Sequence, residues 1–140
     1  MKDNELIRRA AEFRSRAYAP YSGFAVGAVL LAASGRVYGG ANVENASYPV
    51  GICAERTAIA AAVTAGERAF EALAVIADSP APCAPCGMCR QMLMEFPLKR
   101  VILANTAGAV RVLTPAELLP HAFGAAALPV KEHTDENTDC

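Results

Sequence analysis

The first hydrophobic pattern in the chain has a helical period. Apolar residues recur every three or four positions, with arginines between them, at Leu6, Ala10, Phe13 and Ala17. One apolar face and one charged face are typical of an amphipathic helix that packs on a hydrophobic core. The sequence therefore predicts an opening helix that ends before Pro20.

Strand-like and helix-like segments alternate along the rest of the chain. Short apolar runs bounded by Gly, Pro or polar residues predict β-strands at residues 24–33, 37–43, 73–77, 101–104 and 110–113. Helical composition between caps and breaking residues predicts helices at residues 53–65, 86–96 and 115–119. Ser34 and Gly35 between the first two strands favour an antiparallel hairpin. The strand–helix–strand order in the middle favours parallel strands with right-handed crossovers.

This order of elements predicts an α/β fold of three layers. We expect an α/β/α sandwich whose mixed sheet has about five strands, with helices on both faces. The length of 140 residues is that of one domain, to which we assign residues 1–128. Residues 129–140 are mostly polar and predict a disordered tail.

The charge balance and the apolar runs exclude several classes of partner. The 13 basic residues nearly cancel the 14 acidic ones, which leaves no basic surface for a nucleic acid polymer. The longest apolar run, residues 24–33, has about half of the roughly 20 residues that a membrane span needs. The N-terminus lacks a signal-peptide pattern, so we expect a cytoplasmic protein. The apolar share of 54% favours contacts between subunits.

Three cysteines lie at the starts of two predicted helices. Cys53 opens one, and Cys86 and Cys89, on one face, open the other. Successive crossover helices begin at the same end of a sheet, so the three thiols should meet. Three protein ligands leave the fourth tetrahedral position of Zn²⁺ to water, which is the catalytic arrangement. The sequence thus predicts one Zn²⁺ per subunit, with Glu55 placed to touch that water.

A structural zinc site in a non-catalytic interaction domain stays open as an alternative. Cys83 and Cys140 are available as a fourth thiolate that would close the site. Cys83 also lies three residues before Cys86, but Ala84 and Pro85 keep it in the loop ahead of the helix. We therefore expect Cys83 to be a free thiol.

Two arginines adjoin the candidate site. Three thiolates give a zinc centre a net negative charge, which would make its water a poor acid. Arg56, next to Glu55, is expected beside the ligand sulfurs, where its guanidinium offsets that charge. For Arg90, next to Cys89, that role and an exposed surface position both stay open.

Four motifs together resemble the small homotetrameric cytidine deaminases, from about Tyr18 to Leu128. In the order and spacing of that family, they are PYSGFAVGA at 20–28, NVENASY at 42–48, CAER at 53–56 and PCGMCRQ at 85–91. The resemblance implies a homotetramer whose active sites lie at subunit contacts. It also implies that the enzyme hydrolyses free cytidine or 2′-deoxycytidine to the uracil nucleoside and ammonia, as in pyrimidine salvage. Glu55 would carry protons from the zinc-activated water to ring atom N3 and to the leaving amine.

The resemblance also assigns substrate contacts. Asn42 and Glu44 point to one side of an extended chain and would bind the ribose; without the resemblance, a turn-forming Asn and a solvated Glu are the simpler interpretation. The other implied contacts are the Ala54 amide to the base, Phe24 against the nucleoside, Tyr48 at the pocket rim or a subunit contact, and Phe123 at a neighbouring subunit's base. The sugar pair argues against blasticidin and purine deaminases of the same fold.

A few residues stand outside this pattern. His121 and His133 lack metal-ligand spacing and are expected at the surface. Pro49 and Cys83 depart from the commoner family pattern, which affects the expected loop geometry rather than the chemistry.

Overall fold

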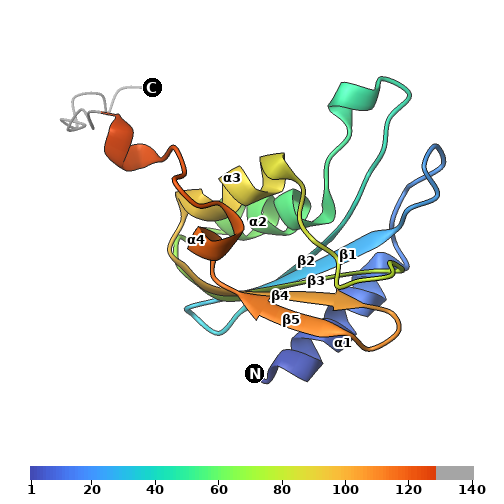
Figure 1. Cartoon of the computed structure of the whole chain (residues 1–140), viewed down its shortest axis with the longest axis horizontal. Helices are drawn as coiled ribbons and strands as arrows, with labels where there is room; N and C mark the ends of the chain where they lie inside the picture. Colours follow the sequence, from blue (N-terminus) through green and yellow to red (C-terminus); the bar gives the residue numbers. More distant parts are fainter. Residues whose placement is uncertain (129–140) are drawn as a thin grey trace.

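The apolar runs of the chain pair into one mixed sheet of five strands. The structure is a computed structural model and describes residues 1–128 (Figure 1); the predicted tail, residues 129–140, lies outside them. The strands are β1 Val26–Ala32, β2 Val37–Ala41, β3 Phe70–Ala77, β4 Leu98–Asn105 and β5 Val110–Leu113. They lie in the order β2-β1-β3-β4-β5. The predicted number of strands is confirmed.

The strand directions follow the predicted topology. β1 pairs antiparallel with β2 across the Ser34–Gly35 turn, as expected. β3 and β4 are joined by a helix and pair parallel, also as expected. β1 pairs antiparallel with β3 as well, so it separates β2 from β3. β4 pairs antiparallel with β5, which forms one edge of the sheet.

Two strands begin three residues earlier than the sequence predicts. β3 begins at Phe70 and β4 at Leu98, because Glu71, Lys99 and Arg100 interrupt the apolar pattern while still belonging to the strands. Their charges are paired: Lys99 Nζ lies 2.8 Å from a Glu71 carboxylate oxygen, and Arg100 donates to Asp3. Charged residues with partners are compatible with a strand, which the composition alone did not indicate.

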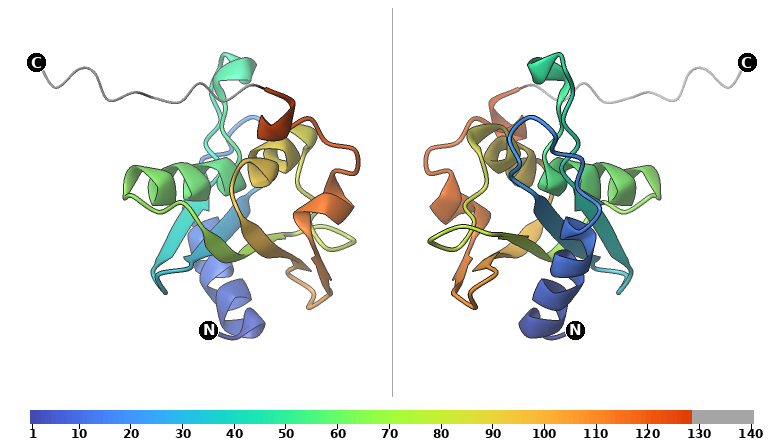
Figure 2. Two further views of the ribbon diagram at one scale, coloured as in Figure 1. Left: turned by 90° about the vertical axis from the view of Figure 1, so that its left-hand side faces the viewer. Right: turned by 90° about the vertical axis from the view of Figure 1, so that its right-hand side faces the viewer.

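Helices cover both faces of the sheet (Figures 1 and 2). They are α1 Asp3–Arg14, α2 Ala54–Thr64, α3 Gly87–Glu95 and α4 Pro115–Leu118, with short 3-10 turns at Tyr48–Val50 and Ala125–Ala127. α1 contributes Leu6 and Ala10 to the core on one face, and α2 and α3 contribute Ala58 and Leu93 to the core on the other. The predicted three-layer sandwich is therefore confirmed. In residues 1–128 no helix has both the length and the apolar character needed to cross a bilayer.

Glycines allow two helices to lie directly on the sheet. A Cβ on Gly40 of β2 would lie 2.6 Å from the carbonyl oxygen of Ala54 and from the amide nitrogen of Ala58. A Cβ on Gly27 of β1 would collide with the backbone of Ala10 and Arg14 in α1. Gly40 therefore fixes the first turn of α2, and Gly27 fixes the last turn of α1, against their strands.

Candidate active site

The thiols of Cys53, Cys86 and Cys89 converge where two helices begin. Cys53 is the N-cap residue of α2, Cys86 is the N-cap residue of α3, and Cys89 lies in the first turn of α3. Their Sγ atoms all lie within 4.8 Å of one another, and those of Cys53 and Cys86 are 3.7 Å apart. Tetrahedral zinc with Zn–S bonds of about 2.3 Å places its sulfurs about 3.8 Å apart. The donor set therefore fits a zinc ion.

The surroundings of the Cys53 sulfur favour thiolate formation. Cys89 is buried, Cys53 is half-buried and Cys86 is exposed. A hydrogen bond from Cys89 lowers the pKa of Cys53 to about 5, while sharing that proton raises the pKa of Cys89. The nearby Arg56 guanidinium also stabilises the Cys53 thiolate. A ligand that is already ionised at neutral pH facilitates metal binding, because protons compete with the metal for sulfur.

Glu55 is a buried carboxyl beside this cluster. It lies in the first turn of α2, is 4% exposed, and contacts Cys89. Burial raises the pKa of Glu55, and the adjacent charge of Cys53 raises it further. A carboxyl whose protonation is shifted toward neutral pH and that lies beside a metal site suits proton transfer.

Arg56 lies near the sulfurs of Cys53 and Cys89. Burial lowers the pKa of Arg56, but its interactions with Cys53 and Cys89 outweigh burial, so the net shift is upward. Its Nε is buried without a hydrogen-bond partner in the described part of the chain. This positive charge opposes the negative charge of three thiolates, which agrees with a metal bound by all three.

Arg90 neither lies beside the ligand sulfurs nor occupies an exposed surface position, the two alternatives left open for it. Its Nε donates to the carbonyl of Pro85 at 2.8 Å, and its Nη1 donates to the carbonyl of Leu118 at 2.8 Å. The guanidinium is half-buried and joins the loop before Cys86 to the end of α4. Arg90 thus holds backbone segments together.

Within residues 1–128, Cys83 and His121 do not join the cluster. Cys83 is 8% exposed, belongs to the apolar core, and lies outside the group of three converging sulfurs found within residues 1–128. It is a free thiol, as predicted, and burial raises the pKa of Cys83 to about 11. His121 is exposed, as expected. The expectations for Cys140 and His133 lie outside the described residues.

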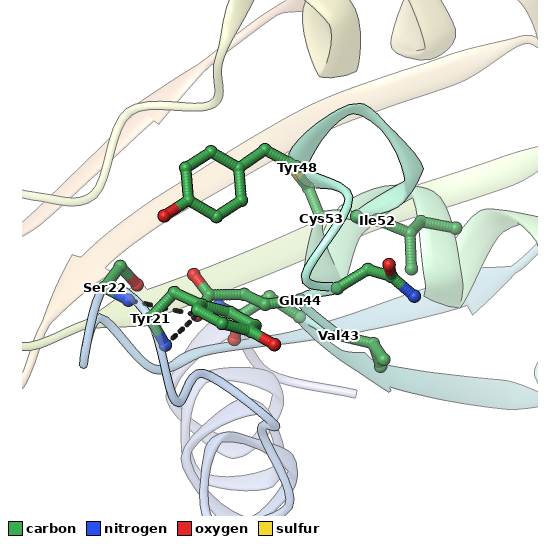
Figure 3. A pocket seen from close by; sticks show the side chains of 10 residues that line it. Tyr21, Ser22, Val43, Glu44, Tyr48, Ile52 and Cys53 are labelled. Carbon is green, nitrogen blue, oxygen red and sulfur yellow. Dashed lines mark hydrogen bonds between the residues drawn. The ribbon is translucent and has the colours of Figure 1, made fainter.

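A pocket of about 420 Å³ adjoins the cluster at Cys53, within the usual size of small-ligand sites. It is lined by Tyr21, Ser22, Asn42, Val43, Glu44, Asn45, Tyr48, Gly51, Ile52 and Cys53. The segment 42–52 projects from the sheet with Tyr48–Val50 near its tip (Figures 1 and 2). Figure 3 shows Tyr48 facing Tyr21 and Glu44. The ring centroids of Tyr48 and Tyr21 are 5.7 Å apart.

The predicted sugar pair lines this pocket and contacts the loop before β1. Glu44 Oε1 accepts hydrogen bonds from the backbone N–H groups of Tyr21, at 2.9 Å, and Ser22, at 3.1 Å (Figure 3). Hydrogen bonds from the side chain and backbone of Ser22 lower the pKa of Glu44, so it is ionised at neutral pH. Asn42 Oδ1 accepts from Val26 N–H, and Asn42 Nδ2 donates to the carbonyl of Phe24, each at 2.8 Å.

Three predicted substrate residues do not line the pocket. Phe24 and Phe123 are 44% and 61% exposed, so neither side chain belongs to the core. Ala54 is buried at the start of α2, next to the pocket residue Cys53. Conversely, Tyr21 and Ser22 line the pocket without having been predicted to do so. Their place between Pro20 and Gly23, in a motif already singled out, was the available signal.

The fold and the cluster define a class: an α/β/α protein with three thiols positioned to bind a metal and a buried carboxyl beside them. Comparison with known proteins is more specific. Residues 1–105 match the family model described as the cytidine and deoxycytidylate deaminase zinc-binding region. The chain belongs to this family.

Similar proteins agree with that assignment. The chain is 48% identical to the cytidine deaminase of Sporosarcina psychrophila over 125 residues, which cover 88% of this chain and 92% of that protein. It is similar in structure to the cytidine deaminase of Burkholderia pseudomallei, with a TM-score of 0.85, 49% identity, and coverage of 88% of this chain and 100% of that one. For the Mycobacterium tuberculosis cytidine deaminase the TM-score is 0.76 at 38% identity, covering 89% and 99%. The cofactor is zinc, and the three cysteines are positioned to bind it.

Proposed function

We propose that this chain catalyses the hydrolytic deamination of cytidine and 2′-deoxycytidine to uridine and 2′-deoxyuridine, with release of ammonia, in pyrimidine salvage. One observation carries the proposal: a buried carboxyl, Glu55, lies beside three converging thiols, next to a pocket that exposes Asn42 and Glu44. Relatives named cytidine deaminase, at 48% and 49% identity over most of the chain, support the same activity.

Cys53, Cys86 and Cys89 are proposed to hold the zinc ion. When bound, zinc supplies a Lewis acid that lowers the pKa of water, so that water serves as the nucleophile near neutral pH. Arg56 offsets the charge of the three thiolates and so preserves that acidity.

Glu55 is proposed to move the protons of the reaction. It takes a proton from the attacking water and delivers it to ring atom N3, which makes C4 more electrophilic. It then takes the second proton of that water and delivers it to the exocyclic amine, so that the C4–N4 bond breaks and ammonia leaves. Burial of the carboxyl supports this role, because burial raises the pKa of Glu55 and allows it to hold a proton between the two transfers.

The charge of the pocket favours a nucleoside over a nucleotide. The family description includes deoxycytidylate deaminases, whose substrate carries a phosphate. Among the described residues that line the pocket there is one carboxylate, Glu44, and no Lys, Arg or His. A buried phosphate needs cationic donors, whereas Glu44 and Asn42 suit the hydroxyl groups of a sugar.

We also propose a homotetramer whose active sites lie at subunit contacts. Several large apolar side chains are exposed in the single chain, among them Tyr21, Phe24, Tyr48, Val50, Met88 and Phe123, and two of these, Tyr21 and Tyr48, line the pocket. An apolar surface of this kind marks a contact site. Phe123, which does not line the pocket of its own chain, is then available to a neighbour's base. A cytoplasmic location agrees with the four free cysteines of residues 1–128.

The test is the loss of the ultraviolet absorbance of cytidine with purified protein, and of deoxycytidylate under the same conditions. Cytidine is expected to react and deoxycytidylate to react far more slowly. Glu55→Gln, which keeps the shape of the side chain, should still bind about one zinc per chain but lose at least about a hundredfold in kcat. A zinc-loaded wild-type protein that leaves cytidine and 2′-deoxycytidine unchanged would refute the assignment, and blasticidin, purines and a structural zinc role would then be examined.

A further inference from the structure

The loop between α1 and β1, residues 15–25, forms one wall of the pocket and is held by side chains. Tyr18 pairs with the extended segment 42–44 through two backbone hydrogen bonds. Beyond Tyr18, the loop is held by Glu44, which binds the amides of Tyr21 and Ser22, and by Asn42, which binds the backbone of residues 24 and 26. The same two side chains are the proposed ligands of the sugar.

These contacts use only part of the hydrogen-bonding capacity of each side chain. Both loop amides bind the same oxygen of Glu44, Oε1, so Oε2 takes no part in those two bonds. Asn42 uses its oxygen and one of its two N–H groups on the loop. The loop therefore orients both side chains and leaves an acceptor and a donor for the substrate.

Arg14 holds this loop from the other face of the sheet. It is the last residue of α1, and its Nε donates at 3.1 Å to the carbonyl of Ala25. Ala25 lies between Phe24 and Val26, the two residues whose backbone binds Asn42. Gly27, by allowing α1 to touch β1, fixes the backbone of Arg14 at the place from which its side chain reaches this carbonyl.

We propose that Arg14 is a positioning residue for the sugar-binding pair. By holding the carbonyl of Ala25, Arg14 keeps the backbone of residues 24–26 in the conformation that orients the amide of Asn42. Loss of Arg14 should therefore weaken recognition of the sugar hydroxyls and leave the metal cluster and Glu55 unaffected. This inference rests on the proposed deamination of cytidine.

A comparison of two substrates distinguishes a positioning role of Arg14 from a general effect on the stability of the protein. Cytidine has the sugar hydroxyls that Asn42 and Glu44 would bind, and 2′,3′-dideoxycytidine lacks them. For Arg14→Gln, kcat/KM for cytidine is expected to fall about five- to tenfold through KM, with kcat retained. For 2′,3′-dideoxycytidine, kcat/KM should change less than about twofold, because the contact is already missing. Arg14→Lys, which keeps a donor, should recover part of the loss.

Arg8→Gln is the matched control, because Arg8 lies on the same helix and pairs with Glu12 on the exposed surface. It should leave both substrates unchanged. Equal losses of kcat/KM for both substrates in Arg14→Gln, or no loss of kcat/KM for cytidine, would overturn the proposal. If Arg14→Gln does not fold, the same comparison is made with Arg14→Lys. A wild-type protein inactive on both substrates would instead refute the proposed function, and the role of Arg14 with it.

Discussion

Substitution of Gly40 by alanine should damage the proposed metal site, although Gly40 is not one of its three cysteines. The new Cβ would lie 2.6 Å from the Ala54 carbonyl oxygen and the Ala58 amide nitrogen, where an ordinary contact is at least 3.4 Å. Both atoms belong to the backbone of α2, so the helix must move by about 0.8 Å. Overpacking of this kind costs about 1–3 kcal/mol, or about 4–12 °C in Tm for a chain of this length.

The effect on zinc follows from the same displacement. Cys53 is the N-cap of α2 and moves with it, whereas Cys86 and Cys89 belong to α3. A metal site tolerates about 0.2 Å in its ligand distances, which is less than the expected shift. We therefore expect Gly40→Ala to weaken zinc binding about 10- to 100-fold, as measured by competition with a chromophoric chelator, with Tm recorded in parallel.

Gly39→Ala provides the matched control for this prediction. Gly39 is the preceding residue of β2, and its Cβ would meet the Phe13 ring of α1 on the opposite face of the sheet. A half-buried ring can turn away, so this variant should lose some stability and keep its zinc affinity. If both variants lose zinc affinity equally, or if Gly40→Ala binds zinc like the wild type, the link between Gly40 and the metal site is wrong.

Three further predictions concern single side chains. Arg56→Gln should lower kcat about 10- to 100-fold and Arg56→Lys less, because the lysine keeps the charge; equal losses would contradict the charge argument. Cys83→Val should keep zinc content and kcat, and loss of zinc in this variant would indicate a fourth thiolate. Because burial raises the pKa of Cys83 to about 11 from 9.0, alkylation of Cys83 in the wild type at pH 8 should be about 100-fold slower than that of an ordinary thiol and should accelerate as pH rises. His121 has φ 53°, so His121→Gly should raise Tm and His121→Val lower it in thermal unfolding, and the reverse order would refute this strain.

The metal half of the site was predictable because it depends on regular structure. Cys53 and Cys86 stand at helix starts, and helices in this chain can be recognised from composition, caps and breaking residues. The crossover rule then brings successive helix starts to one end of the sheet. Four residues, Cys53, Glu55, Cys86 and Cys89, could thus be placed together without knowledge of any distance.

The pocket wall was less predictable because it depends on loops. Residues 15–25 and 42–52 have no periodic pattern, and their course is decided by individual hydrogen bonds such as those of Asn42 and Glu44 with the loop backbone. The resemblance indicated that these two side chains share a site, but its motif at 20–28 did not by itself show that Tyr21 and Ser22 supply the opposite wall. Arg90 shows the same limit, since its carbonyl partners at Pro85 and Leu118 are 33 residues apart in the sequence.

The two halves of the site should therefore respond differently to substitution. The thiols and Glu55 belong to helix starts that lie directly on the sheet, so changes beneath α2 alter the metal site and the reaction step. Asn42 and Glu44 depend on a loop that is held by single hydrogen bonds and, through Arg14, by a helix on the opposite face. Changes in α1 should therefore alter the recognition of the sugar before they alter the chemistry. Substitutions on opposite faces of one sheet would then separate zinc affinity from KM, although both halves border the same pocket.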